Sequence, residues 1–146
     1  MSEPLNVSVS HFCICTDDLD RSASFYAEGL GFELEYYVSF TEPFEVMTQL
    51  PGVAGRAGFF NRNGVRIELL VYDKPGTIRP PELRPLNMLG LTHLSLVVDD
   101  LDAAIERIES FGGQALTETR ISIPQGEMMF CTDPNGTRIE LWEKTA

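Results

Sequence analysis

The ten residues at 11–20, HFCICTDDLD, recur at 93–102 as HLSLVVDDLD. Each copy begins with a histidine and ends with the sequence Asp-Asp-Leu-Asp. Without a gap, this offset of 82 residues continues to Gly31 and Gly113. Further along, residues 63–69 (NGVRIEL) and 135–141 (NGTRIEL) agree at six of seven positions with an offset of 72, so the first copy has a middle that is ten residues longer. Self-similarity at a fixed offset indicates a duplicated structural unit.

Each copy predicts one strand, one helix and three further strands. The opening run is short, apolar and rich in β-formers, which is typical of a strand. A carboxylate then caps the helix, Asp17 or Asp18 in one copy and Asp99 or Asp100 in the other, and glycines mark the helix end. The Asn-Gly pairs at 63–64 and 135–136 predict tight hairpin turns. The strands are expected at 9–16, 32–40, 56–61 and 65–72, and at 91–98, 114–122, 127–132 and 137–143.

The chain, residues 1–146, is therefore expected to form a single α+β domain made of two βαβββ modules. Module one spans 8–74 and module two spans 90–145. The segment between them, 75–89, contains four prolines and is predicted to wrap the surface as a linker without regular structure. A loop at 41–55 accounts for the greater length of module one.

Composition excludes several classes of partner. Twenty-two acidic residues against eleven basic ones give a net charge of −11, which opposes binding to nucleic acid or to an anionic membrane. No apolar run is long enough to cross a bilayer, and the start lacks the features of a signal peptide. The three cysteines are an odd number without a secretory signal, so reduced thiols and a cytoplasmic location are expected.

The repeat carries four potential metal ligands, His11 and Glu68 in one copy and His93 and Glu140 in the other. Each glutamate lies inside a strand between core residues, where a lone charge is costly unless it is paired or bound to a cation. Two imidazoles and two carboxylates suit a divalent ion such as Ni, Co, Zn, Mn or Fe. The alternative is that each glutamate pairs with a neighbouring arginine. We favour the metal because the chain has only two histidines and both occupy equivalent points of the repeat.

These features resemble the vicinal oxygen chelate superfamily, which includes glyoxalase I, methylmalonyl-CoA epimerase, extradiol dioxygenases, fosfomycin-resistance enzymes and bleomycin-binding proteins. The resemblance covers nearly the whole chain. It is carried by the two strand-opening histidines, by the Asp-Leu-Asp helix entries, by 25–32 (FYAEGLGF) and by 133–141 (DPNGTRIEL). It implies paired modules forming a partly open, mixed β-barrel-like sheet with the helices outside, a metal on the concave side, and a homodimer.

The ligand set favours a lyase or isomerase of the glyoxalase I or epimerase type. Extradiol enzymes of this superfamily use two histidines and one glutamate, whereas Glu68 supplies a fourth ligand here, as in glyoxalase I. Bleomycin-binding relatives generally lack the ligands. A drug-binding resistance protein and a non-haem iron dioxygenase remain the alternatives.

The resemblance also implies a mechanism. Two neighbouring oxygens of a small substrate chelate the metal, which stabilises the enolate or enediolate formed when a carbon-bound proton leaves. Glu140 or Glu68 would act as the base, with Glu45, or Glu42 in its place, as an additional acid from the loop of module one. No basic set for glutathione is evident, and the turn at 133–136 is unlike that of the epimerases, so neither glutathione nor a CoA thioester is favoured.

A mostly apolar cavity is expected around the metal. Trp142 lies two places from Glu140 and therefore shares its face of the strand. Surface positions are favoured for Arg56, Arg79 and Arg84, with an anion site as the alternative. The predicted substrate-binding residues are Phe59, Phe130, Trp142 and Met128, with Phe40, Phe44 and Met47 as further candidates.

Overall fold

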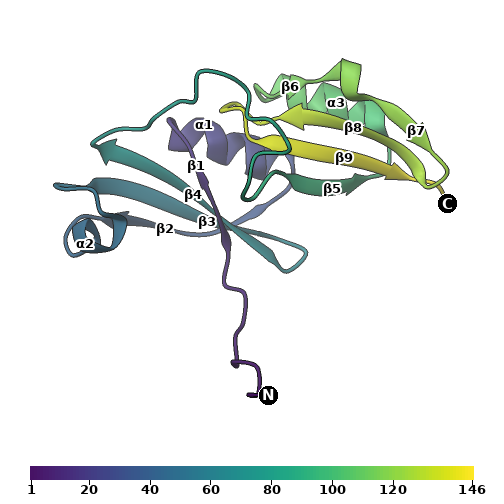
Figure 1. The fold of residues 1–146 in the computed structure, drawn as a ribbon. Coiled ribbons are helices and arrows are strands. Elements are labelled where there is room, and N and C mark those ends of the chain that lie inside the picture. The colour runs from purple at the N-terminus through teal and green to yellow at the C-terminus, as the bar shows by residue number, and fades with distance from the viewer.

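The computed structural model describes residues 1–146 and contains two sheets, one from each module (Figure 1). In the first sheet the strand order is β1-β4-β3-β2, with β1 parallel to β4 and the other neighbours antiparallel. Its elements are β1 (Phe12–Cys15), α1 (Leu19–Ser24), the π-helical turn η1 (Phe25–Gly29), β2 (Glu33–Phe40), α2 (Phe44–Thr48), β3 (Ala54–Arg62) and β4 (Val65–Lys74).

The second sheet repeats this plan with the order β5-β9-β8-β6, and β7 also pairs with β8. Strand β5 is parallel to β9, as β1 is to β4. Its elements are β5 (Leu94–Val98), α3 (Leu101–Ser110), β6 (Gln114–Ala115), the 3-10 turn η2 (Thr117–Thr119), β7 (Ile121–Ile123), β8 (Gly126–Thr132) and β9 (Arg138–Lys144). The predicted α+β fold of two βαβββ-like modules is confirmed, and the two sheets are not closed into a barrel.

The helix caps are the second aspartate of each predicted pair. The Asp18 carboxylate accepts the backbone N–H of Arg21, and the Asp100 carboxylate accepts that of Ala103, each at 2.9 Å. A short acidic side chain in extended backbone satisfies a free amide of the first turn and also interacts favourably with the positive end of the helix dipole. The duplicated sequence therefore produces the same helix entry twice.

One continuous core joins the two modules. Helix α1 packs on β3 and β4, and α3 packs on β8 and β9 and contacts η1. Buried side chains from both copies, including Phe25, Ile67, Ile139 and Leu141, belong to a single apolar cluster. The modules are thus held together through their helices, which leaves the opposite face of each sheet uncovered.

Three predicted strands differ in the structure. Only β6 and β7 form within the run 114–122, because η2 interrupts it, and the Thr119 hydroxyl donates to the Leu116 carbonyl at 2.6 Å. Strands β1 and β5 are shorter than expected: their pairing begins only with Phe12 opposite Ile67 and with Leu94 opposite Ile139. Both histidines consequently lie one residue before a strand rather than inside it.

Residues 75–93 contain no helix or strand. Their path is fixed by Arg84, whose guanidinium donates to the carbonyls of Leu89 and Leu91. None of the helices has the length and apolarity needed to cross a membrane. The first ten residues extend away from the body of the molecule (Figure 1).

Candidate metal centre

The first predicted ligand pair is formed where β1 meets β4. His11 Nε2 lies 3.1 Å from Glu68 Oε2, and both side chains are partly shielded from water. The register sets Glu68 opposite Phe59 on β3, and the His11 ring meets the Phe59 ring edge-on, with centroids 5.2 Å apart. The Ser10 hydroxyl lies 2.8 Å from His11 Nδ1.

The second pair has the same construction. His93 Nε2 lies 3.8 Å from Glu140 Oε2, and the His93 ring meets Phe130 edge-on at 5.1 Å. The Thr92 hydroxyl lies 2.8 Å from His93 Nδ1. Each histidine is thus held between a phenyl ring and a hydroxyl, with Nε2 turned toward its glutamate.

The two hydroxyls suit a metal-binding imidazole. A histidine that binds through Nε2 must carry its proton on Nδ1, whereas one that donates from Nε2 to a carboxylate needs an acceptor lone pair on Nδ1. A hydroxyl serves both states because it can donate or accept. Outer-shell partners of this kind set the ring orientation and the tautomer of histidine ligands.

The two glutamates differ in their second partner. Ser95, opposite Glu140 on β5, donates its hydroxyl to Glu140 Oε1 at 2.7 Å. Cys13 takes the equivalent position opposite Glu68. Neighbouring atoms shield its thiol although β1 is an exposed edge strand, and this partial burial, together with the charge of Glu68, raises the pKa of Cys13 to about 12. The partner of Glu68 is therefore a neutral thiol, which is a weak donor.

Within one chain the four predicted ligands do not converge. No group of three or more His, Cys, Asp or Glu side chains lies close enough to hold a metal ion. The pairs are separated because the modules contact each other through their helices, while each pair lies on the other face of its own sheet.

The donor chemistry of each pair nevertheless fits a borderline divalent cation. One imidazole nitrogen and one carboxylate oxygen already face each other, the nitrogen is pre-oriented, and the carboxylate is partly exposed at 17% for Glu68 and 20% for Glu140. A protein site for such an ion needs three or four protein ligands, so two halves are required. His11, Glu68, His93 and Glu140 fit the ion only as a combined set.

The remaining predicted site residues divide into two groups. Met128 pairs with Trp142 across β8 and β9, and Phe130 pairs with Glu140, so these residues share the uncovered face of the second sheet with the ligand pair. Glu45 lies in α2 and is half-buried, and the exposed Glu42 lies just before this helix; neither forms an ion pair with His11 or His93.

Arg56, which lies in β3, and the linker residues Arg79 and Arg84 already have partners. Arg56 forms a two-pronged hydrogen bond with Asp73, which lowers the pKa of that carboxyl. Arg79 pairs with Asp17. Arg84 binds linker carbonyls, as described above, so surface and structural roles account for all three.

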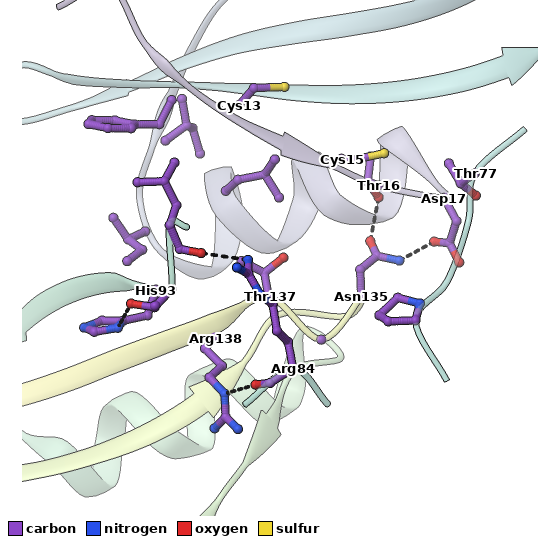
Figure 2. A pocket seen from close by; sticks show the side chains of 18 of the residues that line it. Cys13, Cys15, Thr16, Asp17, Thr77, Arg84, His93, Asn135, Thr137 and Arg138 are labelled. Atoms are coloured by element: carbon purple, nitrogen blue, oxygen red, sulfur yellow. Dashed lines mark hydrogen bonds between the residues drawn. The ribbon is translucent and has the colours of Figure 1, made fainter. Parts of the chain in front are cut away.

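A groove of about 610 Å³ separates the edge strands β1 and β5 beneath the linker (Figure 2). Among the predicted site residues only His93 lines it; Phe12, Ile14, Leu94, Asn135 and Arg138 contribute much of the remaining wall. Figure 2 shows Asn135 bridging Thr16 and Asp17 across this groove, with hydrogen bonds of 2.6 Å each. The free edges of both sheets therefore face a common opening.

Sequence reasoning missed Ser10, Thr92 and Ser95. Ser10 and Thr92 immediately precede the two histidines and fall at the same offset of 82, so the repeat itself contained the signal. Ser95 could be found only from its register with Glu140.

Comparison with known proteins agrees with this architecture. The chain is 32% identical over 136 residues to the uncharacterized protein YaeR of Escherichia coli (strain K12), covering 93% of this chain and 95% of YaeR. The glyoxalase family protein APC24694 of Bacillus cereus superposes with a TM-score of 0.85 at 22% identity, covering 100% of this chain and 99% of that one. The fosfomycin resistance protein FosX of Listeria monocytogenes gives a TM-score of 0.64 at 19% identity, with 97% and 94% covered.

The family model of the Glyoxalase/Bleomycin resistance protein/Dioxygenase superfamily matches residues 8–141. The chain belongs to this superfamily.

Proposed function

We propose that the chain is a divalent-metal-dependent lyase or isomerase whose sites are completed in a homodimer. The observation that carries the proposal is the duplicated half-site, in which a histidine and a glutamate face each other with the same phenyl and hydroxyl neighbours in both modules. Each site would combine His11 and Glu68 of one chain with the partner's His93 and the partner's Glu140. A symmetric dimer then forms two identical sites.

Support for the dimer comes from strand edges and a groove that a single chain leaves unpaired and uncovered. Strands β1 and β5 each have an unpaired edge, and the groove between them is lined mainly by apolar and polar uncharged side chains. Unpaired strand edges and exposed apolar surface favour association with another chain.

The bound metal would supply a Lewis acid for two neighbouring oxygens of a small substrate. Glu68 or Glu140 would accept the carbon-bound proton at a carboxylate oxygen and return it to the product. Phe59 and Phe130 would shield one side of each histidine ring, and Met128 and Trp142 would provide apolar contacts for the substrate. Ser95 holds Glu140 in place, so Glu68, whose partner is a thiol, is the carboxylate with more freedom to move.

The two-chain site can be tested with the variants His11→Ala and His93→Ala. Each variant alone is expected to lose metal binding, because every site lacks one ligand. After the two variants are mixed and allowed to exchange chains, half of the dimers are heterodimers and each contains one intact site, so about a quarter of the wild-type metal should return. Sites built within one chain would give no recovery, which would contradict the proposal.

The metal itself separates the reaction classes. Protein purified without chelators is expected to contain Ni, Co or Zn near one ion per chain. Iron would instead indicate a dioxygenase, and a chain that binds no metal would indicate a drug-binding resistance protein. A second test uses Glu140→Gln, which should abolish solvent-proton exchange into 2-oxoaldehyde hemithioacetals or acyl-CoAs if either is a substrate.

A further inference from the structure

An arginine stands two residues before each glutamate of the repeat, and the structure gives the two arginines different surroundings. Arg66 Nε lies 2.7 Å from the Glu35 carboxylate, so its charge is neutralised inside module one. Arg138 forms no ion pair. The only hydrogen bond of its side chain runs from Nε to the Arg84 carbonyl at 3.0 Å, and Figure 2 shows its two terminal nitrogens turned away from that carbonyl.

Arg138 lies on the same face of β9 as Glu140. The intervening Ile139 is fully buried, whereas its two neighbours are half-buried, as strand alternation requires. The rise of a strand, roughly 3.3 Å per residue, separates the two Cα atoms by about 7 Å. The side chain of Arg138 therefore starts one strand period from a predicted ligand.

The guanidinium is also tied to the histidine of this half-site. Arg138 Cζ lies 5.8 Å from the centroid of the Phe130 ring, and the His93 ring approaches the same phenyl at 5.1 Å. Arg138 and His93 thus contact a common ring. A half-buried cation with both terminal nitrogens free is arranged to receive a planar or tetrahedral oxyanion through two parallel hydrogen bonds.

We propose that Arg138 binds an anionic oxygen-acid group of the substrate, a carboxylate or a phosphonate, a few bonds from the oxygens held beside Glu140. This inference rests on the proposed function, since it takes the second half-site as part of the active site. It assigns recognition of the anionic substrate group to module two. The equivalent Arg66 cannot bind the anionic group in this way because it already forms an ion pair with Glu35.

Small chelators that differ only in charge test the subsite. The cobalt-loaded protein is titrated with 3,4-dihydroxybenzoate, with 3,4-dihydroxyphenylphosphonate and with the neutral 3,4-dihydroxybenzamide, and the dissociation constants are read from the cobalt absorption spectrum. Wild-type protein should bind at least one acid about tenfold more tightly than the amide, as expected for a charge-assisted pair. The acid that binds more tightly than the amide by the larger factor identifies the preferred group, carboxylate or phosphonate.

Arg138→Met should reduce that acid-to-amide ratio to near one, and Arg138→Lys should retain part of it. Lys144→Met is the matched control, because Lys144 lies on the same strand face, four residues beyond Glu140, and its ammonium covers Trp142 at 4.4 Å. It removes the same charge and should leave the ratio unchanged.

Equal ratios in wild-type protein and Arg138→Met would overturn the subsite, and so would a loss of equal size in Lys144→Met. Metal content is measured first for every variant. Wild-type protein that takes up no cobalt would overturn the proposed function and the subsite with it, whereas normal uptake without discrimination would overturn the subsite alone.

Discussion

The two modules share one plan but differ at the positions around their ligand pairs. In module one, Arg66 is neutralised by Glu35 and Glu68 faces a neutral thiol. In module two, Arg138 keeps its charge free and Glu140 accepts a hydroxyl hydrogen bond. Both copies therefore keep a histidine facing a glutamate, while the side chains around the two pairs differ.

The largest expected effect tests whether the modules are equivalent as ligand donors. Glu68→Gln and Glu140→Gln should each weaken metal binding by more than about 100-fold, because removal even of outer-shell partners costs 10–100-fold. Competition with a chelator of known affinity measures the change. Glu45→Gln is the control and should bind metal like the wild type, because Glu45 lies in α2 and forms no ion pair with His11 or His93. A large loss in only one of the two glutamine variants would show that the modules are not equivalent.

The next effect concerns the contact between the modules. The Tyr26 hydroxyl from module one donates to Asp133 Oδ2 of module two at 2.9 Å, and the hydroxyl is buried, which raises the pKa of Tyr26 well above its usual value. Tyr26→Phe should lower the free energy of unfolding by about 1–3 kcal/mol, because the buried carboxylate loses a donor. Urea denaturation measures this. Tyr37→Phe removes an exposed hydroxyl and should have little effect, and equal losses in the two variants would contradict the interpretation.

A smaller effect is expected from the hydroxyls behind the histidines. Ser10→Ala and Thr92→Val should each weaken metal binding about tenfold, because the imidazole loses the partner that orients it. Ser10→Thr and Thr92→Ser keep a hydroxyl and should retain the wild-type affinity. The ¹⁵N shifts of the imidazoles report the tautomer directly, and an unchanged tautomer and affinity in both deletion variants would refute the orienting role.

The smallest effect concerns two equivalent positions of the shared core. Cys131 pairs with Ile139, the position that Phe60 occupies opposite Ile67 in module one. Burial, followed by the charge of Asp133, raises the pKa of Cys131 to about 12 from 9.0. Above pH 9 the unfolded chain loses this proton first, so stability falls as pH rises toward the folded value.

Cys131→Ala should remove that dependence. The decrease in the free energy of unfolding between pH 8 and 9.5 should therefore be smaller than in the wild type by about 0.8 kcal/mol. Unfolding free energies measured across this range test the prediction. Phe60→Leu changes the equivalent position of module one without removing a titrating group and should leave the slope unaltered. An unchanged slope in Cys131→Ala would show that the thiol does not contribute.

Much of the fold was accessible from the sequence because local chemistry decided it. The Asp-capped helices and the tight Asn63-Gly64 turn depend on neighbouring residues, and the repeat allowed each copy to support the interpretation of the other. The second predicted hairpin turn, Asn135-Gly136, is instead part of a five-residue loop between Thr132 and Arg138, and only its glycine has positive φ. The run 114–122 was predicted incorrectly as a single strand because the Thr119 hydroxyl satisfies the Leu116 carbonyl and also accepts the backbone N–H of Phe130 at 2.9 Å. Such competition between side chain and backbone is not visible in a β-rich composition.

The sequence alone determined the duplicated module, the four candidate ligands at equivalent points of the repeat, and the superfamily. These follow from offsets along the chain, which no folding step can change. Only the tertiary structure decided that the ligands separate into two pairs, that hydroxyls orient the histidines, and that Arg138 keeps a free charge while Arg66 does not. The reason is that these properties depend on which faces the two sheets present after the helices pack together, and that packing joins residues more than a hundred positions apart, such as Tyr26 and Asp133.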